Sequence, residues 1–166
     1  MQALTINIRW FTVFTLMLAF LLTGCQTRPA PGLSPAQIAV LESNGFQLSA
    51  EGWGLDLSGK ILFGFAEDEI SQESQEYITL LTTTLLDAGL RTARVDGHTD
   101  NTGDSTYNRN LSLRRAISVA TVMANAGMPS DGIQTRGLGD SKPVSSNQSR
   151  EGRGENRRVS IIITSP

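Results

Sequence analysis

The sequence predicts an α+β sandwich with helices on one face of a mixed β-sheet, and three observations lead to this prediction. Apolar runs of strand length alternate with amphipathic runs of helix length, in the order β-α-β-α-β-β. Glycine and proline residues fall at the boundaries between these runs. The 166 residues are 39% hydrophobic and 18% charged, which is typical of one globular domain with tethering segments.

The first residues are predicted to be a secretion signal. Trp10–Leu22 is an apolar run preceded by Arg9, and it is shorter than the roughly 20 residues that a membrane-spanning helix needs. The run closes at Leu22-Thr23-Gly24-Cys25, which resembles the bacterial lipobox. In a lipobox the cysteine receives diacylglycerol and becomes the first residue of the mature chain. We therefore expect a signal peptide over residues 1–24 and a lipid on Cys25; the alternative is a signal anchor that keeps its helix.

A linker over residues 25–33 is predicted from Pro29, Pro31 and Gly32, which disfavour regular structure. Gln26, directly after the cysteine, resembles the residue found there in lipoproteins that are sorted to the outer membrane.

Residues 34–53 are predicted to form an N-terminal arm that starts with a helix. Ser34 and Gln37 fit a capping box, Pro35 suits the first helical position, and Gly45 is a stop signal. So short a helix is marginal alone, and it must pack either on its own domain or on a partner.

Residues 54–166 are predicted to form the globular domain. Trp53–Phe63 is expected to be extended, with Ser58-Gly59 as a candidate turn, because apolar residues alternate with small or polar ones at its start. Ser71–Ala88 is expected to be a helix that ends at Gly89, and Leu90–Gly97 a strand. The buried face of that helix is predicted from residues three and four apart: Ile78, Leu81, Leu85 and Ala88.

The second half of the domain continues the alternation. Leu111–Ala126 is predicted to be a helix that Gly127 ends. Ile133–Gly137 is predicted to be a strand, Ser141–Glu155 a long polar loop, and Val159–Ile163 the last strand.

The polar loop His98–Asp104, between a strand and a helix, is the candidate site. Asp100 lies in this loop and Arg115 lies in the helix that follows it. A ligand with an ammonium and a carboxylate group would bridge them, because Asp100 accepts from the ammonium and Arg115 pairs with the carboxylate through two hydrogen bonds. In the alternative interpretation, Asp100 caps the turn and Arg115 pairs with a local acid; the spacing alone favours neither.

Catalytic, metal-dependent and nucleic-acid functions are not predicted. The chain has one histidine, His98, and one cysteine, Cys25, whereas a zinc site needs three or four ligands. It has no G-x-S-x-G motif, and the stretch Asp96–Asp104 lacks the glycine and the glutamate of a calcium loop. The formal net charge of −2 argues against nucleic acid. We expect no enzyme activity, no metal and no cofactor, and a structural role for His98.

Four arginines near the C-terminus form a basic cluster that either attracts an anionic wall polymer or pairs with acids of the domain. They are Arg150, Arg153, Arg157 and Arg158.

Three motifs, GHTDNTGDSTYNRNLSLRRA, RGLGDSKPV and NRRV, occur in this order between Ile61 and Ile163. Together they resemble the OmpA-like peptidoglycan-binding domain of porin-type OmpA proteins, the Pal lipoprotein and flagellar stator proteins. The resemblance implies an OmpA-like α/β sandwich that binds the diaminopimelate residue of the peptidoglycan stem peptide. It places the binding pair at Asp100 and Arg115. The loop around them would be shaped by Thr99, Asn101 and Gly103.

One loop departs from this resemblance. Many members of the family have polar residues in the loop after the first strand, whereas this chain has Phe65 and Ala66 within 64–68. We expect few hydrogen bonds from that loop.

The segment GLSPAQIAVLESNGFQLSAEGWGLDLSGKILFG resembles the YfiB-type lipoproteins of a three-component signalling system. That resemblance implies that the arm sequesters a YfiR-like periplasmic repressor and so activates a diguanylate cyclase. Its partner-facing residues would be Ile38, Leu41, Phe46 and Trp53. The alternative is a purely structural tether like Pal, and a second copy of the chain is a further candidate partner.

Overall fold

The computed structural model describes residues 32–63 and 70–164. The predicted signal peptide, Cys25, most of the linker and the loop over 64–68 lie outside the described residues. Within the described ranges, no helix has the length and apolar character needed to cross a membrane.

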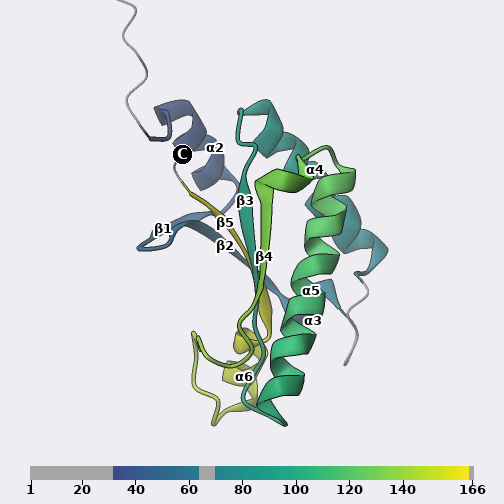
Figure 1. The fold of residues 1–166 in the computed structure, drawn as a ribbon. Helices are drawn as coiled ribbons and strands as arrows, with labels where there is room; N and C mark the ends of the chain where they lie inside the picture. Colours follow the sequence, from purple (N-terminus) through teal and green to yellow (C-terminus); the bar gives the residue numbers. More distant parts are fainter. Residues whose placement is uncertain (1–31, 64–69, 165–166) are drawn as a thin grey trace, which may run out of the picture. The chain divides into compact units, whose positions relative to one another are not determined.

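A five-stranded mixed sheet forms the centre of the domain, in the order β1-β2-β5-β3-β4 (Figure 1). Strands β3 and β4 are parallel, and the other neighbours are antiparallel. Because a parallel pair needs a crossover connection, the helix between β3 and β4 must lie against the sheet. The strands are β1 Gln47–Ser49, β2 Gly52–Ser58, β3 Ala93–Gly97, β4 Ile133–Gly137 and β5 Arg158–Ile163.

Two long helices, α4 and α5, lie side by side, and α5 packs against β3 and β4 (Figure 1). Their apolar faces and alternate residues of β5, such as Val159 and Ile161, form the buried core. The fold class is therefore confirmed. The helices are α2 Pro35–Ser43, α3 Gly59–Leu62, α4 Gln72–Asp87, α5 Ser105–Asn125 and α6 Arg150–Asn156, with a 3-10 turn at Ser130–Gly132.

Strong local signals placed three elements correctly. The capping box of α2 is present, because the Ser34 hydroxyl accepts from the Gln37 N–H at 3.2 Å and Gln37 Oε1 accepts from the Ser34 N–H at 2.9 Å. Ile78, Leu81 and Leu85 are buried on α4, as their spacing predicts. Strand β4 has the predicted bounds.

Four parts of the fold differ from the prediction, since most of these segments lack a clear apolar period. The extended run ends at Ser58, because α3 follows it, and strand β1 was not predicted. Helix α5 begins at Ser105 rather than at Leu111, because Asp104 caps its polar first turn. The predicted loop Ser141–Glu155 contains most of α6, which starts after the cap Ser149.

The arm is part of the domain in this structure. Strand β1 pairs with β2, and Gln37 Nε2 donates to the Ala88 carbonyl at the end of α4, at 3.1 Å. The predicted boundary between residues 53 and 54 therefore does not separate two packing units.

This packing corrects two of the predicted partner-facing residues. Leu41 is 0% exposed and Phe46 is 3% exposed, and both side chains belong to the domain's own core. Ile38 and Trp53 are half-buried, and Trp53 packs against the edge of the core. The large apolar residue that the arm exposes is instead Leu48, which is 69% exposed.

Candidate functional site

Two glycines of the sheet bring helix α5 into contact with β3 and β4. A Cβ atom at Gly97 would lie 1.9 Å from the Ser112 carbonyl oxygen, and one at Gly137 would lie 2.5 Å from the Arg109 carbonyl oxygen. No other residue type permits so close an approach of two backbones. The end of β3, and the loop after it, are thereby held at a set distance from α5.

We expect Gly97→Ala to destabilise the domain by about 1–3 kcal/mol, since its methyl group would overlap the α5 backbone. Urea unfolding measures the effect. The matched control is Gly54→Ala, where the nearest atom to the new methyl group, Ile162 Cγ1, is 4.0 Å away. Equal stabilities of the two variants would contradict the proposed contact.

Asp100 is buried in the loop after β3, and its carboxylate has two partners. Oδ1 accepts from the Thr102 backbone N–H at 2.9 Å, and Oδ2 accepts from Arg157 Nη1 at 2.5 Å. Asp100 therefore caps the turn, as the alternative interpretation states. Arg157 is a partner that sequence reasoning did not assign to Asp100; the only signal for it was its membership of the NRRV motif and of the basic cluster.

Burial alone would raise the pKa of Asp100, but the hydrogen bonds from Arg157 and Thr102 and the charge of Arg157 outweigh it and lower this pKa below its usual value. A carboxylate with a lowered folded-state pKa stabilises the fold above its unfolded pKa of about 3.9, and this contribution is lost as the pH falls through the folded value.

Arg157→Gln is therefore expected to raise the pKa of Asp100 and to weaken the acid dependence of the unfolding free energy. The pKa is read from the Asp100 carboxyl ¹³C shift during an NMR pH titration. Arg150→Gln is the control, because Arg150 is exposed on α6. An unchanged Asp100 pKa in Arg157→Gln would show that the ion pair does not form in solution.

The buried side-chain amide of Asn108 connects the loop to α5 through hydrogen bonds. Asn108, which is 4% exposed, donates from Nδ2 to the Thr102 carbonyl at 3.0 Å and to the Asp100 carbonyl at 3.4 Å. The Thr99 N–H donates to the Gly139 carbonyl at 2.9 Å. The position of Asp100 is thus set by α5 on one side and by the segment after β4 on the other.

Arg115 lies on α5 and is buried to 6% exposure. Its guanidinium carbon is 5.0 Å from the centre of the Phe63 ring, a cation–π contact. Phe63 is a second residue that sequence reasoning did not assign to the site. It precedes the loop that departs from the family pattern.

Asn108 and Arg115 lie on the same stripe of α5, because residues seven apart differ by nearly two turns. At 1.5 Å per residue, Arg115 is about 10 Å further along the helix axis than Asn108, the residue bound to the Asp100 carbonyl. Arg115 therefore lies about two turns from Asn108 on the same face of α5.

The remaining predicted site residues lie in the same loop. Thr99 is buried, whereas Asn101 and Gly103 are exposed. The Asn101 N–H faces Asn147 Oδ1 at 3.4 Å, and Gly103 has a φ of +92°, which favours glycine.

The basic cluster is partly explained by ion pairs within the domain. Arg157 pairs with Asp100, and Arg158 Nε lies 3.3 Å from Asp56 Oδ2. His98 is buried, and its backbone N–H donates to the Arg158 carbonyl at 2.9 Å. Among the described residues, no three His, Cys, Asp or Glu side chains form a group that could hold a metal ion.

Comparison with known proteins gives a family and a fold. The OmpA family profile matches residues 62–157. The outer-membrane lipoprotein YfiB of Pseudomonas aeruginosa is 50% identical over 152 residues, which is 91% of this chain and 89% of that protein. The YfiB lipoprotein of Escherichia coli is 44% identical over 155 residues, which is 93% of this chain and 94% of that protein.

A solved structure, the cell wall anchor of the T6SS from Pseudomonas aeruginosa, matches with a TM-score of 0.66 at 25% identity, over 82% of this chain and 99% of that one. The likeness to the outer-membrane lipoprotein of Pseudomonas aeruginosa, over most of both chains, assigns the protein to the outer membrane. The profile match over more than half of the residues, together with these relatives, shows that the chain belongs to the OmpA family.

Proposed function

We propose that this protein is an outer-membrane lipoprotein that binds peptidoglycan non-covalently through Asp100 and Arg115. The observation that carries the proposal is the local arrangement. The Asn108 amide of α5 donates to the Asp100 carbonyl in the loop after β3, and Arg115 lies on the same face of α5 as Asn108. The cell wall anchor that shares the fold supports it.

The ligand that fits this pair is the diaminopimelate residue of an uncrosslinked stem peptide. Its free end bears an ammonium and a carboxylate on one carbon. Asp100 accepts from the ammonium, and the Arg115 guanidinium donates two hydrogen bonds to the carboxylate. Arg157 holds the Asp100 carboxylate ionised before the ligand arrives, and Thr99, Asn101 and Gly103 shape the loop around it. Each group thus uses the charge that it carries at neutral pH.

The proposed anchor is a set of acyl chains on Cys25, with the linker between the lipid and the domain. Each buried methylene group contributes about 0.8 kcal/mol, so two or more chains hold a protein stably on a membrane. Mass spectrometry of the mature protein would test the modification, and Cys25→Ser is expected to abolish the acyl mass and to leave the signal peptide uncleaved.

The decisive experiment for the wall-binding function is a sacculus pull-down of a soluble chain that starts at Gln26. Co-sedimentation that is displaced by a free diaminopimelate-containing tripeptide is expected. Displacement by the corresponding lysine-containing tripeptide should be much weaker, because lysine lacks the second carboxylate. Equal displacement by the two peptides would contradict the proposed role of Arg115.

A second proposed function is sequestration of a YfiR-like periplasmic repressor by the arm, which would activate a diguanylate cyclase. Its support is that the YfiB relatives match over the arm as well as over the domain. The candidate contact surface is the exposed side of β1 with Leu48, next to half-buried Trp53, because Leu41 and Phe46 are in the core.

Leu48→Asp is expected to abolish co-purification of such a repressor while leaving sacculus binding unchanged, since Leu48 is exposed and lies outside the Asp100 loop. Val144→Asp is the matched control, because Val144 is 57% exposed on a different segment. If Leu48→Asp left cyclic di-GMP control intact, the purely structural tether would be the better description.

A further inference from the structure

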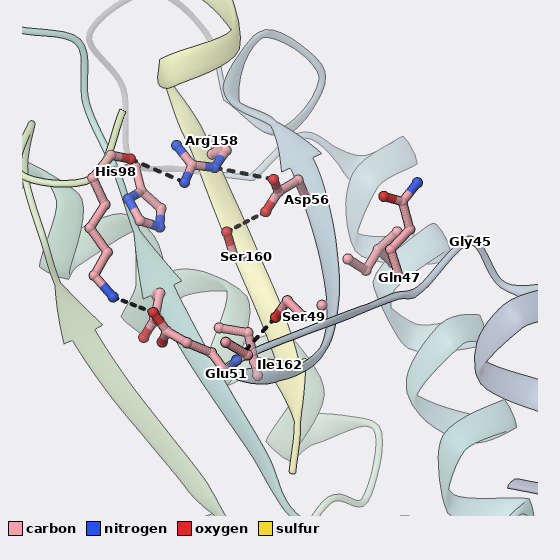
Figure 2. Close-up of a pocket in the computed structure, with 14 residues that line it drawn as sticks. Gly45, Gln47, Ser49, Glu51, Asp56, His98, Arg158, Ser160 and Ile162 are labelled. Atoms are coloured by element: carbon pink, nitrogen blue, oxygen red, sulfur yellow. Dashed lines mark hydrogen bonds and ion pairs between the residues drawn. The ribbon is translucent and has the colours of Figure 1, made fainter. Parts of the chain in front are cut away.

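A pocket of about 610 Å³ lies on the face of the sheet away from the α4–α5 core. On β5, Val159, Ile161 and Ile163 enter the core, so the alternate residues Arg158, Ser160 and Ile162 face the other side and line the pocket. The turn between β1 and β2 forms its other wall (Figure 2). This volume is within the usual range of small-molecule sites, and neither proposed function uses the pocket.

Two buried polar side chains at one end of the pocket have atoms that no partner satisfies. Among residues 32–63 and 70–164, Arg158 Nη1 and His98 Nδ1 have no hydrogen-bond partner. Arg158 is 7% exposed and His98 is 3% exposed, and both line the pocket. A buried polar group without a partner costs about 1–3 kcal/mol, so these atoms indicate a place for a ligand oxygen.

Several other polar groups of the pocket have partners within the domain. Asp56 accepts from Ser160 Oγ and faces Arg158 Nε (Figure 2). Glu51, at the turn between β1 and β2, pairs with Lys142 and, at 2.5 Å, with Arg94 Nη2.

The charged residues that line the pocket are two cations, Lys142 and Arg158, and three carboxylates, Glu51, Asp56 and Asp96. Arg94 and Arg136 lie outside the lining and pair with Glu51 and Asp96. Burial and the charge of Arg158 lower the pKa of His98 to about 4, although Asp96 and Asp56 oppose the shift, so its imidazole is neutral at neutral pH. At the Arg158 end of the pocket, a guanidinium nitrogen without a partner therefore suits a single carboxylate.

Leu55 and Ile162 supply the apolar part of the lining. We propose that this pocket binds a small organic monocarboxylate, with its carboxylate against Arg158 and His98 and its apolar part against Leu55 and Ile162. Consecutive arginines then serve two sites, since Arg157 pairs with Asp100 of the loop and Arg158 faces the pocket.

Benzoate is a suitable probe, because it combines one carboxylate with an apolar ring, and benzamide is its neutral counterpart. On the soluble mature chain, benzoate is expected to shift the NMR signals of the His98 ring and of Arg158 Nε saturably, with a Kd of about 1 mM. Benzamide should give no saturable shift. An equal response to inorganic phosphate and benzoate, or no saturable response to benzoate, would overturn the proposal.

Arg158→Gln and Asp56→Asn are expected to change benzoate binding in opposite directions, so a folding defect cannot explain both results. Arg158→Gln should abolish the benzoate response. Asp56→Asn should tighten benzoate binding several-fold, because it removes the carboxylate that competes for Arg158. Asp104→Asn, which removes the same charge outside the pocket, should not change it. If Asp56→Asn and Asp104→Asn bound benzoate equally, the proposed position of the carboxylate would be wrong.

Asp100→Asn should leave benzoate binding intact, so this site and the wall-binding site can fail separately.

Discussion

Replacing Asp100 with asparagine, or Arg115 with lysine, is expected to abolish retention of the protein on purified sacculi. Asparagine keeps an oxygen for the Thr102 N–H but loses the charge that the ligand's ammonium needs. Lysine keeps a positive charge beside Phe63 but cannot donate two parallel hydrogen bonds to one carboxylate. Loss of one partner of a desolvated charge pair costs about 2–5 kcal/mol. Affinity should therefore fall by roughly thirty-fold to a few thousand-fold.

Asp104→Asn is the matched control for this loss. It removes one negative charge from the same loop, and asparagine is as good a helix cap as aspartate, so α5 should keep its start. Circular dichroism and urea unfolding of each variant separate loss of binding from loss of fold. Retention of Asp100→Asn on sacculi at the level of Asp104→Asn would refute the assigned site.

Leu41→Ala is expected to destabilise the protein by about 2–5 kcal/mol, because it opens a cavity under a fully buried side chain. The loss is a large part of the total stability of a domain of this size. Urea unfolding measures it, and a single transition would show that the arm unfolds together with the domain.

Leu48→Ala is the control for Leu41→Ala, since the same atoms are removed seven residues later from a side chain that is 69% exposed. Its stability should stay within about 0.5 kcal/mol of the unchanged protein. If the two variants were equally stable, the arm would be detached from the domain in solution, and Leu41 would again be a candidate for contact with a partner.

Most of the fold could be predicted because its elements carry their own local signals. The capping residues of α2, the apolar stripe of α4 and the short apolar run of β4 each depend on residues within one element. The elements that sequence reasoning missed carry no such signal. Helix α6 is a polar segment, and β1 is a three-residue strand without a buried side chain. Both are specified by what they pack against.

The candidate site, likewise, could be predicted only in part. The positions of Asp100 and Arg115, fifteen residues apart around one strand-to-helix connection, could be read from the chain. Their surroundings could not, because Arg157 and Phe63 come from distant segments. The contacts of Gly97 and Gly137 with the α5 backbone, and the hydrogen bonds of Asn108, determine how close the loop and the helix come.

The sequence by itself determined the fold class and the family, because periodicity, caps and motif spacing are properties of short stretches of chain. Only the tertiary structure decided whether the arm packs on its own domain or is free to contact a partner. An apolar face such as that of Leu41 can be buried in its own domain or against a partner, and the sequence is the same in both cases. Burial depends on which surface offers a complementary apolar site, and here the domain core offers it.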